Sequence, residues 1–215
     1  MTTTPLPELL TVPNGNAVLQ NISWQNYQAM LADMGDHRVN RLAYECGALE
    51  IKMPLEFHEA INRLLERLII TLTEELELEI KSFGSTTFNR KDIEVGVEPD
   101  SCFYIQNASL VRRFQIDLQN DPVPDLVVEV DVHSSSIRRL NIYKRLGVPE
   151  IWRYTKTGIK IYNLQNGEYA AQEFSATFAF ISGEILDRFL KRSDSMDDNK
   201  LVREFRTWVR QQLSQ

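Results

Sequence analysis

The stretch PDLVVEVDVHSSS at residues 124–136 constrains the fold of this chain most strongly. Side chains alternate across a β-strand, which gives the stretch two different faces. One face carries Leu126, Val128, Val130 and Val132, and the other carries Asp125, Val127, Glu129 and Asp131. The apolar face predicts burial against a helix. Burying ionised carboxylates is costly unless a cation compensates, so the acidic face predicts a divalent-cation site, or else exposure to solvent or pairing with nearby arginines.

Another acid stands at the start of a second predicted strand. Glu98-Pro99-Asp100 precedes SCFYI, just as Pro124-Asp125 opens the first strand. If the two strands are neighbours, Asp100 lies beside Glu129. Carboxylate oxygens are the ligands that hard cations such as Mg2+ or Mn2+ prefer, and such an ion can generate a nucleophilic hydroxide and neutralise a phosphate.

The charge of the chain limits the class of partner. A net charge of −6 argues against a protein that coats nucleic acid without specificity, because that binding requires clustered Lys and Arg. Residues 111–160 nevertheless contain nine basic and six acidic residues. The acids of the first strand therefore lie in the most basic part of the chain.

Length and composition predict an ordinary globular protein, with 215 residues, 43% hydrophobic and 25% charged. The longest apolar runs are far shorter than the roughly 20 residues of a membrane span, and MTTTPLPELL lacks the features of a signal peptide. We therefore expect a cytoplasmic protein with no membrane segment. Cys46 and Cys102 match no metal-binding spacing and indicate two free thiols, although the sequence does not exclude a disulfide.

Periodicity and turn signals predict an α/β fold with a central mixed sheet flanked by helices. We predict one domain at 21–190, an N-terminal extension at 1–20 and a C-terminal helical extension at 191–215. Helices are expected at 23–35, about 56–81, 137–147, about 183–191 and about 197–213, with Ser134, Ser135 and Ser136 as candidate N-caps for the third. Strands are expected in a hairpin around Cys46-Gly47, near 83–90, within 98–107, at 125–132, in a hairpin at 150–165 and at 168–174. The helix after PDLVVEVDV should connect two parallel or neighbouring strands.

These motifs together resemble a known family. Asp100 on one strand and Glu129-Val130-Asp131 on the next are similar to the PD-(D/E)XK nuclease superfamily. More closely, LAYECGALEIKMPLEFHEAI, EPDSCFYIQN and PDLVVEVDVHSSSIRRLNIYKRLGVPEIWRY resemble the Uma-two family of restriction-endonuclease-like proteins in its cyanobacterial form, over about residues 15–190. The resemblance implies a restriction-endonuclease-like core, metal-dependent cleavage of DNA and a homodimer. It also implies that Asp100 and Glu129 ligate Mg2+ or Mn2+.

Asp131 departs from the superfamily pattern, because it stands where the motif has a lysine that orients water or stabilises charge. Two interpretations remain open. Either Lys144 on the following helix supplies the cation, or Asp131 is a further metal ligand or base and no lysine is needed. Lys144 as a plain solvated helix residue is the alternative to a catalytic role.

His58 matches the family's histidine in LEFHEAI and is expected beside the site, although a lone His near an apolar face is more often a hydrogen-bonded core residue. Glu45 and Glu50 on the hairpin are further candidates, although both are expected to be ordinary exposed strand acids. Asp125 reads best as a turn residue. For Trp152 and Tyr154, packing in the sheet is favoured over base stacking.

The sequence thus supports two functional hypotheses. The first is a Mg2+-dependent DNA endonuclease with Asp100, Glu129 and Asp131 as metal ligands and catalytic groups, and with Lys144 and His58 as further catalytic candidates. The second is a catalytically degenerate nuclease fold that serves as a nucleic-acid-binding or assembly module, suggested by the missing lysine and the acidic total.

Overall fold

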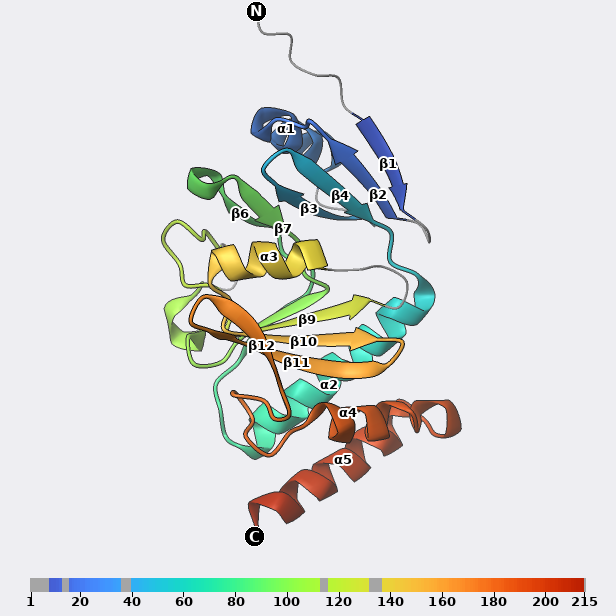
Figure 1. Ribbon diagram of the computed structural model, residues 1–215. Helices are drawn as coiled ribbons and strands as arrows, with labels where there is room; N and C mark the ends of the chain where they lie inside the picture. Colours follow the sequence, from blue (N-terminus) through green and yellow to red (C-terminus); the bar gives the residue numbers. More distant parts are fainter. Residues whose placement is uncertain (1–7, 13–15, 36–39, 113–115, 132–136, 215) are drawn as a thin grey trace, which may run out of the picture.

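The computed structural model describes residues 8–12, 16–35, 40–112, 116–131 and 137–214. It contains two six-stranded sheets. Figure 1 shows the sheet built mainly from N-terminal strands at the top, the second sheet below it, and α3 between them. The helices are α1 (Trp24–Met34), α2 (Glu56–Glu75), α3 (Ile137–Leu146), α4 (Gly183–Leu190) and α5 (Asp198–Leu213), with short 3-10 turns at Lys91–Ile93, Ala108–Leu110 and Ser193–Ser195.

The lower sheet is mixed, as the sequence predicts. Its strand order is β12-β11-β10-β9-β8-β5. The strands are β5 (Lys81–Phe83), β8 (Ser101–Tyr104), β9 (Leu126–Asp131), β10 (Glu150–Thr155), β11 (Gly158–Gln165) and β12 (Glu168–Gln172). β9 and β10 run parallel and are connected through α3, while the other neighbours pair antiparallel. β8 pairs directly with β9, which confirms that Asp100 and Glu129 lie on neighbouring segments.

The upper sheet is antiparallel throughout and was only partly predicted. Its strands, in spatial order, are β1 (Glu8–Val12), β2 (Asn16–Gln20), β4 (Ala48–Lys52), β3 (Arg41–Glu45), β7 (Val95–Val97) and β6 (Phe88–Arg90). The predicted hairpin is confirmed, and Cys46 and Gly47 both have positive φ (43° and 91°), as its two-residue turn requires. β1, β2 and β7 were not expected. The predicted N-terminal extension therefore contributes two strands to this sheet.

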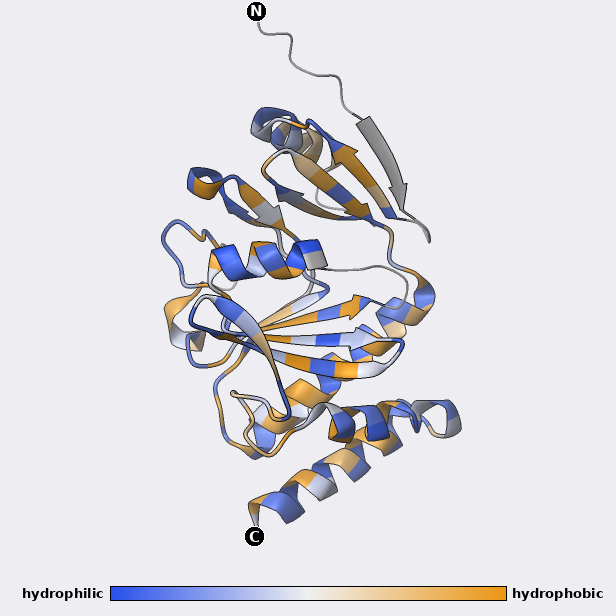
Figure 2. Ribbon diagram, in the orientation of Figure 1, coloured by the Kyte–Doolittle hydropathy of each residue, from blue (hydrophilic) through white to orange (hydrophobic). Residues whose placement is uncertain are grey.

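The long helix α2 packs across the apolar face of β9. Leu68, Ile69 and Leu72 lie in one buried cluster with Leu126 and Val128. Figure 2 shows hydrophobic residues recurring along α2 and along the strands that it crosses. The apolar side chains of β9 therefore face α2, as the alternation predicts. Val132, the last of the predicted apolar set, lies outside the described residues.

Two features at the ends of α2 complete this layer. The helix stops at Glu75 rather than near 81, because Glu77 takes a left-handed conformation (φ 54°) and the chain returns as β5. In the predicted C-terminal extension, α5 packs against α2, and its Leu201 and Phe205 join the same core.

The opposite face of β9 meets α3. Ile142 and Tyr143 of α3 share a second buried cluster with Val127 and Ile151. A third cluster holds α1 against the upper sheet, where the rings of Tyr27 and Tyr44 stack 4.8 Å apart. The face of β9 that carries the acids is therefore covered rather than open to solvent.

Three other expectations concern the chain as a whole. Cys46 is an exposed free thiol and Cys102 a buried one. No helix in the described part of the chain is long and apolar enough to cross a membrane. The serines predicted to cap α3 lie outside the described residues.

Candidate active site

Three carboxylates predicted from the sequence come together beneath α3. Asp100 immediately precedes β8, and Glu129 and Asp131 project from the same face of β9. They are 6%, 1% and 4% exposed, respectively. Acids so deeply buried need compensation, and the structure supplies it with side chains of the protein.

Lys52 is the cation at the centre of this cluster. Its Nζ lies 2.8 Å from Asp100 Oδ2, 3.3 Å from Glu129 Oε2 and 3.6 Å from Asp131 Oδ1. It also donates a 2.9 Å hydrogen bond to the carbonyl oxygen of Val130. The side chain is 2% exposed, so three carboxylates converge on one buried ammonium group.

The hairpin of the upper sheet places Lys52 there. Lys52 is the last residue of β4, and alternation puts its side chain on the same face as that of Glu50. Both are buried, at 2% and 7% exposure. The hairpin was predicted from the apolar alternation of Leu49, Ile51 and Met53. The charged alternation of Glu50 and Lys52 beside it was the available signal for Lys52.

A second buried cation, Arg139, reaches the cluster from α3. Its Nη1 donates to the carbonyl oxygen of Glu98 at 2.8 Å and to Glu129 Oε1 at 3.3 Å, and its Nε donates to Glu50 Oε1 at 3.3 Å. One helical turn later, the hydroxyl of Tyr143 donates to Glu129 Oε1 at 2.5 Å. Spacing of four residues on a helix places both side chains on the face that meets β9.

Each of the other two carboxylates also has a partner besides Lys52. Asp131 Oδ2 accepts from Nε of Arg153 at 2.8 Å, because Arg153 lies beside Glu129 in the parallel ladder. Asp100 Oδ2 accepts from the backbone N–H of Val130 at 2.8 Å. Arg139, Tyr143 and Arg153 were therefore missed as site residues, since only the three-dimensional ladder and helix packing show what they reach.

The charges of the cluster shift one another's protonation equilibria. Burial by itself would lower the pKa of Lys52, but Asp100, Glu129 and Asp131 outweigh that effect and raise it, so the amine is firmly protonated. Burial raises the pKa of Glu129, and Arg139 and Lys52 offset part of that rise. Burial and the neighbouring Glu129 raise the pKa of Tyr143, which keeps its hydroxyl a donor.

Two predicted catalytic candidates make other contacts. Lys144 pairs with the exposed Glu168 of β12 at 3.0 Å, so the residues of α3 that reach Glu129 are Arg139 and Tyr143 instead. This contact fits the alternative of a solvated helix residue, since the position of Lys144 on α3 directs it to β12. His58 accepts the backbone N–H of Leu55 through Nδ1 at 2.9 Å, a contact that caps the start of α2.

The remaining candidates divide between structural and site roles. Asp125 accepts from the backbone N–H groups of Ile105 and Asn107, a structural role that holds the segment after β8 rather than its own turn. Trp152 is fully buried in the core, which confirms packing. Glu50 joins the ion network through Arg139, as described above.

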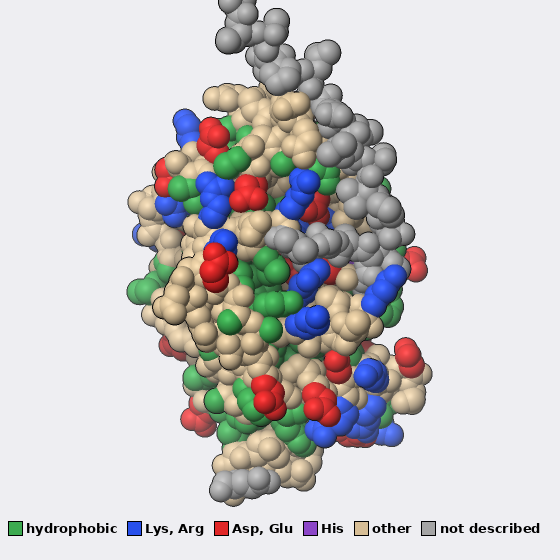
Figure 3. Space-filling view, in the orientation of Figure 1, with side chains coloured by type: hydrophobic (Ala, Val, Ile, Leu, Met, Phe, Trp, Pro, Cys, Tyr) green, Lys and Arg blue, Asp and Glu red, His purple; other side chains and the backbone are tan. Residues whose placement is uncertain are grey.

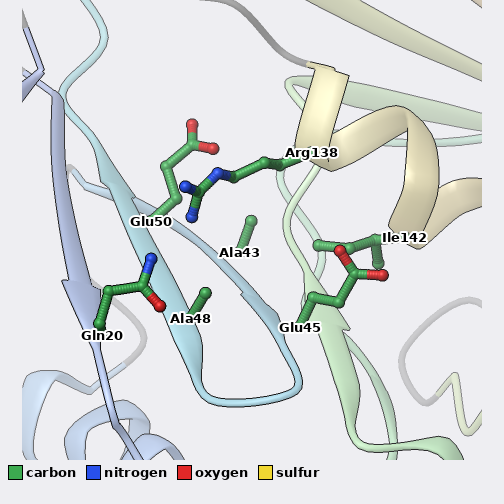
Figure 4. Close-up of a pocket in the computed structure, with 7 residues that line it drawn as sticks. All are labelled: Gln20, Ala43, Glu45, Ala48, Glu50, Arg138 and Ile142. Carbon is green, nitrogen blue, oxygen red and sulfur yellow. The ribbon is translucent and has the colours of Figure 1, made fainter.

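A cavity of about 280 Å³ lies next to this network. Figure 4 shows Arg138 reaching from α3 toward Glu50 on β4 at this cavity. Since Glu50 also accepts from Arg139, the cavity ends on the buried ion network. Its lining residues are Gln20, Ala43, Glu45, Ala48, Glu50, Arg138 and Ile142.

The outer surface carries both signs of charge. On the face in Figure 3, Lys and Arg side chains are interspersed with Asp and Glu side chains. This agrees with the net charge of −6 and differs from the broad basic surface of a non-specific nucleic-acid coat.

The oxygens of Asp100, Glu129 and Asp131 are chemically suited to a hard divalent cation, but in this structure they are paired with Lys52. Carboxylate oxygens are the ligands that Mg2+ and Mn2+ favour. Within the described ranges, however, no group of three or more His, Cys, Asp or Glu residues is arranged to hold a metal ion. The three carboxylates turn to the Lys52 ammonium instead.

Comparisons with known proteins agree on the kind of fold. A solved structure from Anabaena variabilis, titled as a "putative nuclease belonging to DUF820", matches with a TM-score of 0.55 and 15% sequence identity. The match covers 78% of this chain and 98% of that one, and at this identity it shows the fold. No curated protein matches. The Uma2 family model, described as "Putative restriction endonuclease", matches residues 24–190, and the chain therefore belongs to the Uma2 family.

Proposed function

We propose that this protein is a Mg2+- or Mn2+-dependent endonuclease that hydrolyses phosphodiester bonds in DNA. The observation that carries the proposal is the convergence of Asp100, Glu129 and Asp131 on one buried point that also holds a lysine. Family membership supports nuclease chemistry in general. The DNA substrate, the metal and action as a homodimer, which rests on family resemblance, are parts of the proposal.

The carboxylates are proposed to ligate the metal, which would supply a hydroxide nucleophile near neutral pH and neutralise charge on the phosphate. Each carboxylate is positioned by a neighbour before any ligand arrives. Arg139 and Tyr143 orient Glu129, and the backbone N–H of Val130 orients Asp100. Pre-oriented ligands lose little conformational freedom on binding, which favours a defined geometry.

Lys52 is proposed to supply the positive charge that the resemblance places at position 131. Its ammonium lies 3.6 Å from Asp131 although it comes from β4. When the carboxylates hold the metal instead, the ammonium would lie next to the scissile phosphate and donate to a non-bridging oxygen, whose negative charge grows in the transition state. Lys52 would thus occupy the place of the motif lysine in three dimensions, although it stands at a different position in the sequence.

Cleavage of plasmid DNA tests this function. Wild-type protein should nick or linearise supercoiled plasmid in Mg2+ or Mn2+ and be inactive with a chelator. Glu129→Gln should lower the rate by about 10²–10³-fold, because the variant lacks a charged ligand of the metal that stabilises transition-state charge. Glu168→Gln, at a side chain that is 77% exposed, is the matched control and should retain the wild-type rate. Equal cleavage by wild type and Glu129→Gln would refute the assignment.

One observation favours the alternative of a catalytically degenerate binding module. Each of the three carboxylates already has a cationic or backbone partner within the protein. A module of this kind would bind DNA or a protein partner without metal and without dependence on Asp100. Absence of cleavage and of calorimetric Mn2+ binding, with DNA binding unchanged in Asp100→Asn, would support this alternative.

A further inference from the structure

The Lys52 ammonium occupies the point where the carboxylates of Asp100, Glu129 and Asp131 meet. A metal ion that used the same oxygens, at the roughly 2.0–2.1 Å of Mg2+ coordination, would have to lie close to that point. An ammonium and a divalent cation cannot share it, because their volumes overlap and their charges repel. We propose that Lys52 and the divalent cation compete for the same carboxylates, so that the metal binds only when the Lys52 ammonium moves out. This inference rests on the proposed metal dependence.

The carboxylates are arranged so that they keep partners when Lys52 leaves. Asp100 keeps the backbone N–H of Val130. Glu129 keeps Arg139 and Tyr143, and Asp131 keeps Arg153. Removing the only cation from a buried acid strongly destabilises the fold, but each of these three acids would retain a hydrogen-bond donor.

When Lys52 leaves, the net charge of the cluster becomes more negative, which favours binding of a divalent cation. Ion pairs join the carboxylates of Glu50, Asp100, Glu129 and Asp131 to the cations Lys52, Arg139 and Arg153. Four carboxylates against three cations give a net charge of −1. Without Lys52 the net charge is −2, which one divalent ion neutralises.

An unpaired buried donor indicates that the site accepts a further group that carries an oxygen acceptor. Nη2 of Arg139 is buried without a hydrogen-bond partner in the described structure, although Nη1 of the same guanidinium contacts Glu129. Such an unpaired buried donor is costly and is expected to meet an oxygen acceptor when the site is filled. Lys52 itself ends β4 and precedes the half-exposed Met53 and Leu55, and its four-carbon stem lets the ammonium move while the backbone stays in place.

Amine labelling of the wild-type protein tests the displacement without any mutation. Lysines are acetylated with a small N-hydroxysuccinimide ester in chelator or in saturating Mn2+, and the labelling rate of each lysine is followed by mass spectrometry. Lys52 should react slowly in chelator, and Mn2+ should accelerate it by about tenfold or more, since a minor open state is populated at roughly 0.1–10%. The exposed Lys160 of β11 is the internal reference, with a constant rate. Stoichiometric Mn2+ binding with no change at Lys52 would overturn the proposal.

The variant Lys52→Met tests the competition independently. Calorimetry should show Mn2+ affinity at least about tenfold higher than in wild type, because the competing cation is gone. Lys160→Met, the same change at a surface position, should keep the wild-type affinity. Affinity in Lys52→Met equal to or below that of wild type, or no Mn2+ binding by either protein, would refute competition. If Lys52→Met unfolds in chelator, the labelling experiment on the wild-type protein decides the proposal by itself.

The outcomes separate this inference from the proposed function. A protein that exchanges Lys52 for Mn2+ but cleaves no DNA would retain the competition and lose the nuclease assignment. A protein that cleaves DNA while Lys52 stays protected would retain the nuclease assignment and lose the competition.

Discussion

Glu129 is the residue on which most contacts of the site meet. Its Oε1 accepts from Tyr143 and Arg139, and its Oε2 faces Lys52. Three donors on one buried carboxylate fix its direction before any ligand binds. The sequence could not predict these donors, because alternation along β9 placed Glu129 on one face of the strand but identified none of its partners.

The Tyr143 hydroxyl should contribute measurably to this arrangement. Tyr143→Phe removes the 2.5 Å bond to Glu129 Oε1 without changing the shape of the ring. Because the acceptor is charged and buried, we expect the free energy of unfolding to fall by about 1.5–3 kcal/mol. Urea denaturation at pH 7 measures it. Tyr154→Phe is the control, because within the described part of the chain the Tyr154 hydroxyl makes no hydrogen bond. An equal loss in both variants would contradict this role of Tyr143.

Asp131 and Lys52 show where reasoning from the sequence succeeded and where it could not. The departure of Asp131 from the superfamily pattern was visible, and so was the need for a cation nearby. Lys144 was the lysine nearest along the chain, yet Lys52, which lies 79 positions before Asp131, is the one whose ammonium is 3.6 Å away. Proximity of this kind depends on how two sheets meet, which no local pattern encodes.

At the scale of elements, the strongly periodic segments were predicted well. β9, α2 and α3 follow directly from alternation or from a 3.6-residue apolar stripe. The short strands β1, β2 and β7 were missed because three to five residues carry too little periodicity to distinguish them from loops. The consequence was that the upper sheet, which carries Lys52, was reduced to one hairpin.

The attachment of α5 to α2 offers a test at this scale. Glu75 accepts from Arg206 at 2.6 Å and from Arg210 at 2.7 Å, and hydrogen bonding to Arg210 is the largest cause of a lowered Glu75 pKa. A lowered pKa stabilises the fold above the ordinary value of 4.5, and that contribution disappears as the pH falls through the native value.

We therefore expect Glu75→Gln to lower stability at pH 7 by about 1 kcal/mol, since the arginines are solvent-accessible and screened. The deficit should shrink progressively below pH 4.5 and with added salt. Guanidinium is itself a salt, so urea denaturation across pH is the suitable measurement. A deficit that stays constant from pH 7 to the acid limit of folding would show that the loss is not electrostatic.

At the scale of the whole molecule, the site exists because two sheets and a helix meet. β4 of the upper sheet brings Lys52 and Glu50, β9 of the lower sheet brings Glu129 and Asp131, and α3 brings Arg139. The core that holds them lies largely on the other face of the lower sheet, where α2, α4 and α5 pack. The main apolar core and the ion network therefore lie on opposite faces of β9, so substitutions at the acids leave the main core filled.

We propose that the carboxylate cluster is the metal site of a nuclease and that Lys52 occupies it until a metal ion binds. The decisive measurement is a crystal structure of the protein soaked in Mn2+, with anomalous scattering measured at a wavelength where Mn2+ contributes strongly. We expect one anomalous peak shared by Asp100 and Glu129, with the Lys52 ammonium displaced from its position 2.8 Å from Asp100. A structure at saturating Mn2+ with no peak there, and with Lys52 still paired to the three carboxylates, would contradict it.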